Sequence, residues 1–117
     1  MIDLLFIALG GALGAVLRYV TKLLCGNTTF PFATLTVNLL GCLLIGFLGG
    51  ICKDFHKSFV VVGLLGAFTT FSSFGLETCD LFMKGNHTLG FLNIAINNIL
   101  GLGLCFLGLW LGRLIVR

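Results

Sequence analysis

Charged residues are scarce in this chain: aspartate, glutamate, lysine and arginine together make up 9% of its 117 residues. Soluble domains carry about 25% charged residues. Hydrophobic residues make up 58% of the sequence instead. This balance excludes an ordinary water-soluble domain and predicts a membrane protein with very little outside the bilayer. The formal net charge of +3 is small, and we expect no nucleic-acid partner.

The chain also lacks the residue combinations that carry enzyme chemistry. It contains no recognisable nucleophile–base set, metal-ligand cluster or phosphate-binding glycine loop, so we expect no enzymatic activity. The cysteines have no CxxC spacing, and most fall in apolar segments, where cysteine behaves as a small apolar residue. His56 and His87 fall in connecting loops, where we expect them to be solvated. The five cysteines are Cys25, Cys42, Cys52, Cys79 and Cys105.

Four apolar stretches, at residues 2–24, 32–52, 59–83 and 89–112, are each long enough to cross a bilayer once. The first begins with acidic Asp3 instead of a basic region, so we do not expect it to be a cleaved signal peptide. The pattern predicts an all-α, multi-pass protein of the cell inner (plasma) membrane, with residues 1–117 as a single four-helix transmembrane domain. An even number of crossings would leave both termini on the same side.

Lysine and arginine are nearly balanced between the two sides of the predicted bundle, and it is their imbalance that normally sets orientation. Such a chain can insert both ways, and two opposite copies can then pack as an antiparallel dimer. Two other interpretations stay open: orientation is fixed weakly, or Arg18 is a pore residue and should not be counted. The terminal side has Lys53, Lys57, Arg113 and Arg117, and the other side has Arg18, Lys22 and Lys84.

Glycine is abundant, with 17 residues against a single proline. In membranes, small residues let helix backbones approach closely, because lipid provides no hydrophobic drive for helix association. Small residues recur every four positions in three of the spans, which predicts a tightly packed bundle. The stripes are Gly10 and Gly14 in the first span, Cys42, Gly46 and Gly50 after Asn38 in the second, and Gly101 and Cys105 after Asn97 in the fourth.

The third span contains the polar run Thr69-Thr70-Phe71-Ser72-Ser73-Phe74, where hydrocarbon should be continuous. Hydroxyls at that depth are costly unless they face a cavity or another protein surface. We therefore expect the third helix to be broken mid-membrane. Broken helices at the bilayer midplane are where transport proteins tend to build ion sites.

Asn38 lies in a span without charges, and two interpretations of it are open. It can form an interhelical hydrogen bond, or its NH2 group can donate to a dehydrated anion. Phe71 and Phe74 are three residues apart and share a helical face. They can be packing aromatics, or their positive ring edges can attract a small anion, with the Ser72 and Ser73 hydroxyls as further donors.

The fourth span holds three amides, Asn93, Asn97 and Asn98, of which the first two share a face. We expect Asn93 and Asn97 to line the same polar path as residues 69–74. Arg18 can snorkel to the interface or form a positive vestibule that concentrates anions. Glu77 can pair with a cation or cap a neighbouring helix. Most of these groups are donors that do not titrate, which favours movement of a small anion.

The chain resembles the bacterial fluoride channel family (Fluc) over essentially its whole length. Residues 10–19 (GGALGAVLRY) look like the first-helix signature of that family. Residues 34–41 (TLTVNLLG) look like its second-helix stretch. Residues 66–74 (GAFTTFSSF) look like its third-helix signature, with Glu77 at the position of a family glutamate. Departures from the pattern are Ala33 and Ala67 in place of glycine and Ser73 in place of threonine.

The resemblance implies an antiparallel, dual-topology homodimer with two fluoride pores, through which fluoride leaves the cell passively. It implies that Asn38, Phe71 and Phe74 line the pore and that Ser72 and Ser73 belong to its polar track. It also implies a central structural sodium ion, held at the dimer interface by the backbone carbonyls of Gly66 and Thr69.

Two rival classes can be set against this. A small four-helix multidrug-type exporter is also antiparallel and dimeric, but it needs a membrane-embedded carboxylate in its first span. This chain has Arg18 in that span, and Asp3 only at its extreme end. A non-transporting membrane protein would not need polar residues in three spans.

Overall fold

The computed structural model describes residues 1–51 and 57–117, and these residues form helices joined by short connections. Cys52, Lys53 and His56, which entered the predictions above, lie outside the described residues, and the side chain of Lys57 is likewise not described. The α-helices are α1 (Ile2–Cys25), α2 (Phe32–Ile51), α3 (Gly66–Phe68), α4 (Phe71–Met83), α5 (His87–Ala95) and α6 (Gly101–Val116), and the π-helical segments are η1 (Lys57–Leu65) and η2 (Ile96–Leu100).

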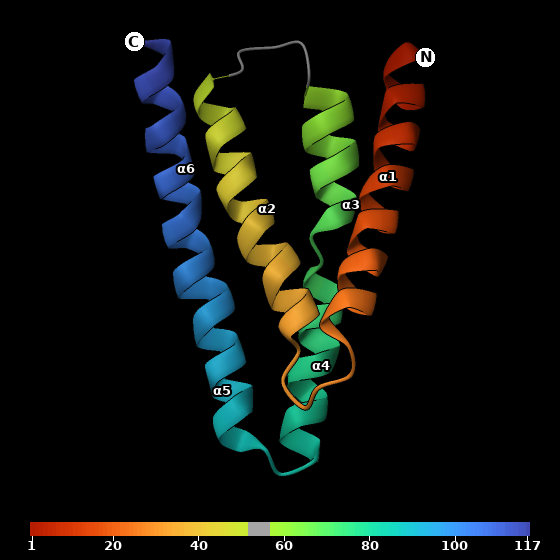
Figure 1. Ribbon diagram of the computed structural model, residues 1–117, viewed down its shortest axis with the longest axis vertical. Coiled ribbons are helices and arrows are strands. Elements are labelled where there is room, and N and C mark those ends of the chain that lie inside the picture. The colour runs from red at the N-terminus through yellow and green to blue at the C-terminus, as the bar shows by residue number, and fades with distance from the viewer. Residues whose placement is uncertain (52–56) are drawn as a thin grey trace.

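The described residues contain four helical stretches that are long and apolar enough to cross a membrane. This confirms the predicted all-α membrane protein with four spans. Both chain ends lie at the same end of the bundle, as Figure 1 shows. The stretches are Ile2–Cys25, Phe32–Ile51, Phe59–Met83 and His87–Val116.

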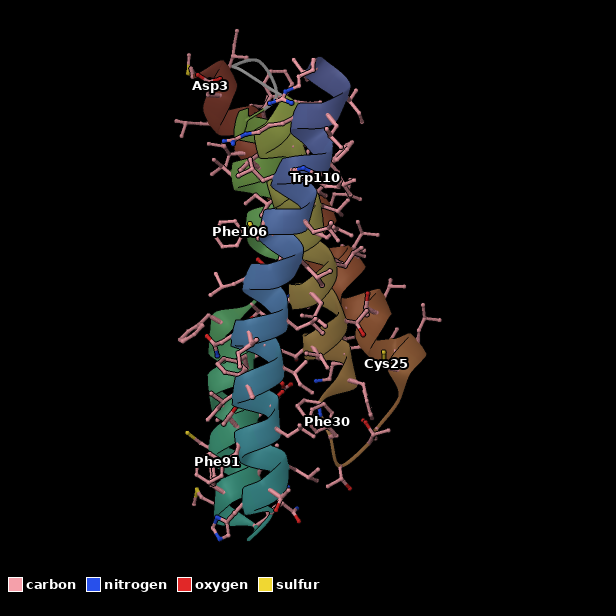
Figure 2. The ribbon with its side chains drawn as sticks, turned by 90° about the vertical axis from the view of Figure 1, so that its left-hand side faces the viewer. Asp3, Cys25, Phe30, Phe91, Phe106 and Trp110 are labelled. Carbon is pink, nitrogen blue, oxygen red and sulfur yellow. The ribbon has the colours of Figure 1, made fainter. Side chains whose placement is uncertain are left out.

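The large apolar side chains lie mostly on the outside of the bundle, whereas several polar side chains are buried inside it. Phe91 and Phe106 point away from the helices in Figure 2, and Phe106 is 72% exposed. In contrast, Asn93 is 0% exposed and Thr70 and Thr78 are buried. An apolar exterior around a partly polar interior fits a lipid bilayer as the surrounding solvent.

Glycines bring the helices together in two pairs. On α1, a Cβ atom at Gly10 or Gly14 would run into the backbone carbonyls of Phe59 and Leu64 in η1. Between α2 and α6, a Cβ atom at Gly46 would collide with the Cys105 carbonyl. At Gly10, Gly14 and Gly46 the predicted stripes therefore mark close approaches in which there is no room for a side chain.

The third span is interrupted between α3 and α4. Thr69 (φ −79°, ψ 158°) and Thr70 (φ −153°, ψ 115°) are both extended, and α4 begins again at Phe71. Figure 1 shows the chain uncoiling at this point between the two helices. The interruption leaves backbone groups of residues 66–73 without their usual helical partners.

Candidate functional site

The interrupted segment is held open by hydrogen bonds from side chains. The Thr70 N–H donates to Asn38 Oδ1 at 2.8 Å, across from α2. The Ser73 N–H donates to Thr70 Oγ1 at 3.2 Å, so that Thr70 caps the N-terminus of α4. Polar side chains thus replace the backbone partners that a continuous helix would have supplied.

These two hydrogen bonds free two backbone carbonyls. In a continuous helix the Gly66 carbonyl would accept from the Thr70 N–H, and the Thr69 carbonyl would accept from the Ser73 N–H. Both donors are engaged elsewhere, with Asn38 and with the Thr70 hydroxyl. The predicted sodium-binding carbonyls of Gly66 and Thr69 are therefore among those that lose their helical donors at the interruption.

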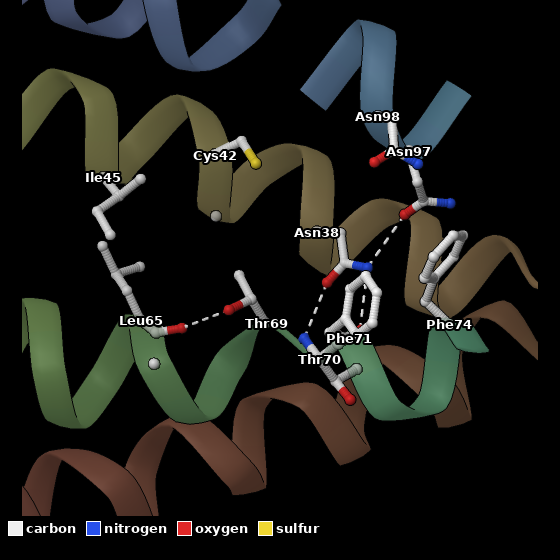
Figure 3. A pocket seen from close by; sticks show the side chains of 12 residues that line it. Asn38, Cys42, Ile45, Leu65, Thr69, Thr70, Phe71, Phe74, Asn97 and Asn98 are labelled. Atoms are coloured by element: carbon white, nitrogen blue, oxygen red, sulfur yellow. Dashed lines mark hydrogen bonds between the residues drawn. The ribbon is translucent and has the colours of Figure 1, made fainter. Parts of the chain in front are cut away.

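A pocket of about 320 Å³ opens beside the interruption, between α2, α3, α4 and η2. Figure 3 shows Asn38 at its centre, between Thr70 and Asn97, with Phe71 and Phe74 beside it. Small and apolar residues of α2, η1 and α3 form the rest of the wall, among them Gly41, Ile45 and Leu65. The lining residues are Asn38, Gly41, Cys42, Ile45, Leu65, Gly66, Thr69, Thr70, Phe71, Phe74, Asn97 and Asn98.

Phe71 and Phe74 lie together, as their spacing predicts, but their surroundings differ. Their ring centroids are 5.4 Å apart with an interplanar angle of 54°. Phe74 is buried, whereas Phe71 is 80% exposed in the single chain. Phe71 therefore contributes little to packing within one copy of the chain.

The Asn38 amide is fully engaged by other groups of the chain. Its Nδ2 donates to the Thr70 carbonyl at 3.2 Å and to Asn97 Oδ1 at 3.0 Å. Its Oδ1 accepts from the Thr70 N–H. Asn38 thus forms the interhelical hydrogen bonds that the first interpretation expects. An anion that binds its NH2 group would have to replace one of these two acceptors.

The asparagines of the fourth span are placed in three different ways. Asn93 is fully buried, and its Oδ1 accepts from Asn97 Nδ2 at 2.9 Å. Asn97 and Asn98 belong to the π-helical segment η2 and line the pocket. Asn98 is exposed and donates to the Ile94 carbonyl. Asn97 and Asn98 therefore line the pocket, while Asn93 lies behind Asn97.

A second, larger pocket of about 780 Å³ lies at the end of the bundle away from the termini. The predicted vestibule residue Arg18 lines it, together with Lys22, Lys84, Glu77 and Asp80. Thr70 lines both pockets, so the interruption separates them. Ser73 also lines the larger pocket, whereas Ser72 is exposed on the neighbouring face of α4.

Glu77 is held by Thr34, in the first turn of α2. Thr34 Oγ1 donates to Glu77 Oε1 at 2.9 Å. Glu77 Oε2 is buried and has no hydrogen-bond partner in the described part of the chain. Glu77 thus lines the larger pocket while one of its carboxyl oxygens is buried without a partner among the described residues.

Two threonines of the site were not singled out from the sequence: Thr34 and Thr78. Each is buried, and they bond to Glu77 and to the predicted site residue Asn93 respectively. A signal existed, because a hydroxyl inside an apolar span needs a partner. Nothing local to each threonine identifies that partner.

The chain matches a family model described as CrcB-like protein, Camphor Resistance (CrcB), over residues 5–109. A protein of Dehalococcoides mccartyi named "Fluoride-specific ion channel FluC" is 47% identical, with 97% of this chain and 94% of that protein covered. A protein of the same name from Campylobacter fetus is 44% identical, with 91% and 90% covered. A third, from Parabacteroides distasonis, is 39% identical, with 99% and 97% covered.

Proposed function

Because the chain belongs to the CrcB-like family, whose matched members are named as fluoride-specific ion channels, we propose that it is a fluoride channel that exports the ion by passive diffusion. The observation that carries this proposal is the interrupted third span, where Asn38, Phe71 and Phe74 meet at one pocket. Ion channels are not enzymes, in agreement with the expectation from the sequence.

The chemistry of the pocket is suited to a small, strongly hydrated anion. A pore for fluoride must replace the hydration shell of the ion with hydrogen-bond donors and positive ring edges. The pocket offers amide groups from Asn38 and Asn97, and the rings of Phe71 and Phe74. The hydroxyls of Ser72 and Ser73 extend this polar track along α4. The second pocket, with Arg18 and Lys22, would attract anions to one end of the path.

The functional unit in this proposal is an antiparallel, dual-topology homodimer with two pores. The near balance of lysine and arginine between the two sides supports it. The 80% exposure of Phe71 supports it as well, because a pore aromatic needs a second wall that one copy does not provide. Terminal tags should be accessible from both sides of the membrane. Tags accessible from one side only in every copy would contradict this arrangement.

A structural sodium ion at the two-fold axis is the remaining part of the proposal. The freed carbonyls of Gly66 and Thr69 fit it, since hard cations take oxygen ligands and two copies would supply four such atoms. When bound, the ion would join the two interrupted helices. Replacing sodium by a large organic cation should lower dimer stability. Thr69→Ser should be tolerated because the carbonyl persists.

The experiment that tests the channel function is fluoride efflux from liposomes that contain the purified protein. We expect efflux of fluoride that needs no proton gradient and that strongly exceeds efflux of chloride. The exporter alternative predicts proton-coupled movement of organic cations instead. A non-transporting membrane protein predicts no efflux of either ion.

A further inference from the structure

Asn38 is one member of a continuous series of side-chain hydrogen bonds that crosses the bundle. Asn38 Nδ2 donates to Asn97 Oδ1 at 3.0 Å, and Asn97 Nδ2 donates to Asn93 Oδ1 at 2.9 Å. Asn93 Nδ2 then donates to Thr78 Oγ1 at 2.9 Å, and Thr78 Oγ1 donates to the Phe74 carbonyl at 2.6 Å. Every bond in this series donates in the same direction, away from the interruption.

Both ends of the series are backbone groups that cannot reverse their role. At one end the Thr70 N–H is a donor only, so the atom of Asn38 that faces it must be Oδ1. At the other end the Phe74 carbonyl is an acceptor only, so the single hydroxyl proton of Thr78 is directed to it.

The direction of each amide in between follows from these ends. Because the Thr78 hydroxyl has given its proton to Phe74, it can only accept from Asn93, which must present Nδ2. Asn93 therefore presents Oδ1 to Asn97, and Asn97 presents Oδ1 to Asn38. Asparagine amides can flip in general, but here a flip of one amide would oppose donor to donor or acceptor to acceptor.

Thr78 and Asn93 lie away from the ion path itself. Thr78 is buried on α4 and Asn93 is completely buried on α5, and neither lines either of the two pockets described above. They therefore act behind the pocket and not at its wall. Asn97 Nδ2 also donates to the Asn93 backbone carbonyl at 3.0 Å, so the Asn93 side chain reinforces an Asn97 orientation that this acceptor-only group also requires.

We propose that Thr78 and Asn93 are positioning residues, which hold the Asn97 amide in place beside Asn38 and thereby reinforce the orientation that keeps the Asn38 NH2 group on the pocket side. This inference rests on the proposed channel function for its meaning, but the orientation of the amides is a property of the folded chain alone. A hydrogen-bonded series in a low-dielectric interior is also mutually polarised, so loss of one member weakens its neighbours.

The decisive variant is Thr78→Val, which keeps the shape of the side chain and removes the hydroxyl. Asn93 Nδ2 then loses its acceptor, and the series is anchored at its Thr70 end but no longer at its Phe74 end. We expect fluoride efflux from liposomes to become about tenfold slower or more, where tenfold corresponds to about 1.4 kcal/mol. Thr78→Ser keeps the hydroxyl and should restore efflux. Thr78→Ala serves the same purpose if the valine variant does not fold.

Thr21→Val is the matched control. Thr21 makes the same bond to the carbonyl four residues earlier, Leu17 at 2.9 Å, but its side chain is at the surface and receives no amide. Its substitution should leave efflux unchanged.

A second readout is the side-chain amide resonances of Asn38 and Asn97 in nitrogen-15 spectra of the full chain. They should shift in Thr78→Val, return in Thr78→Ser and stay in place in Thr21→Val, with exposed Asn27 as an internal reference. Slow efflux with unchanged Asn38 resonances, or shifted resonances with normal efflux, would each overturn the proposal. If the unmodified protein shows no fluoride efflux, the channel function fails, while the resonances still test the orientation of the amides.

Discussion

The two halves of the bundle are held together by different means. In the half that carries the termini, glycines of α1, α2 and α6 let backbones meet directly, as at Gly46 and Gly108. In the other half, α2, α4, α5 and η2 are joined by side-chain hydrogen bonds, such as those of Asn38 and Asn93. Close backbone packing serves to hold the helices together, whereas the side-chain hydrogen bonds also place donors and acceptors beside a pocket.

Glycine stripes and buried amides tolerate different kinds of substitution. A glycine contact fails when any atom is added, because backbone atoms on the other side cannot move aside. A buried amide fails when its donors or acceptors change, even if its volume is kept. Substitutions that separate volume from polarity can therefore break one half at a time.

The largest expected effect comes from Gly46→Leu. The Cβ atom of the added side chain would clash with the Cys105 carbonyl and would lie 3.1 Å from the Cys105 Cα atom. We expect loss of the folded protein, measured as loss of a monodisperse peak in detergent. Gly103→Leu is the matched control, since a Cβ atom at Gly103 has nothing within 4 Å, and it should purify normally. A folded Gly46→Leu protein would contradict the backbone contact.

Asn38→Asp should abolish fluoride efflux while changing the volume of the side chain very little. A carboxylate can still accept from the Thr70 N–H, but it cannot donate to the Thr70 carbonyl or to Asn97 Oδ1. It would also repel an anion. We expect efflux to fall about a hundredfold or more, corresponding to about 2.7 kcal/mol. Efflux at the wild-type rate in a folded Asn38→Asp protein would remove Asn38 from the path.

Phe71→Ile should stop most fluoride efflux without harming the fold. The ring is 80% exposed in one copy, so the packing cost should stay below about 1 kcal/mol. Phe106→Ile is a matched control, because Phe106 is also exposed but lines neither of the two pockets. If both variants conduct fluoride equally well, the ring of Phe71 does not contact the ion. Phe74→Ile should also slow efflux, with an additional packing cost because Phe74 is buried.

The smallest effect is expected for Lys84→Ala. Lys84 follows the end of α4, and its Nζ is 2.6 Å from Asp80 Oδ2, but both side chains are largely exposed. Exposed ion pairs contribute about 0–1 kcal/mol. The temperature of thermal unfolding in detergent should therefore change little. This result would show that, in this half of the bundle, buried polar contacts contribute to stability and exposed ones do not. A large loss of stability would indicate that Lys84 acts beyond this pair.

Much of the fold could be predicted from the sequence. Span positions follow from runs of apolar residues, and the observed stretches begin and end within a few residues of the predicted ones, except that the fourth is longer at both ends. The glycine stripes also predicted the faces on which Gly10 and Gly46 meet neighbouring helices. These features are local, because span length and helical spacing depend on residues close together in the chain.

The candidate site was predictable only in part. The sequence placed the interruption near Thr69 and singled out Asn38, because polar groups in an apolar span are conspicuous. It did not single out Thr78, and it treated Asn93 and Asn97 alike. In the structure Asn97 lines the pocket together with Asn98, while Asn93 lies fully buried behind Asn97.

The sequence by itself determined four apolar spans, the small-residue faces and the position of the polar run, since each is a property of neighbouring residues. Only the tertiary structure decided which polar groups meet. Asn38 and Asn97 are 59 residues apart in the chain, and Asn38 and Thr70 are 32 apart. Their hydrogen bonds, and hence the direction of every amide between Thr70 and Phe74, depend on how the helices pack, and no spacing along the chain encodes that arrangement.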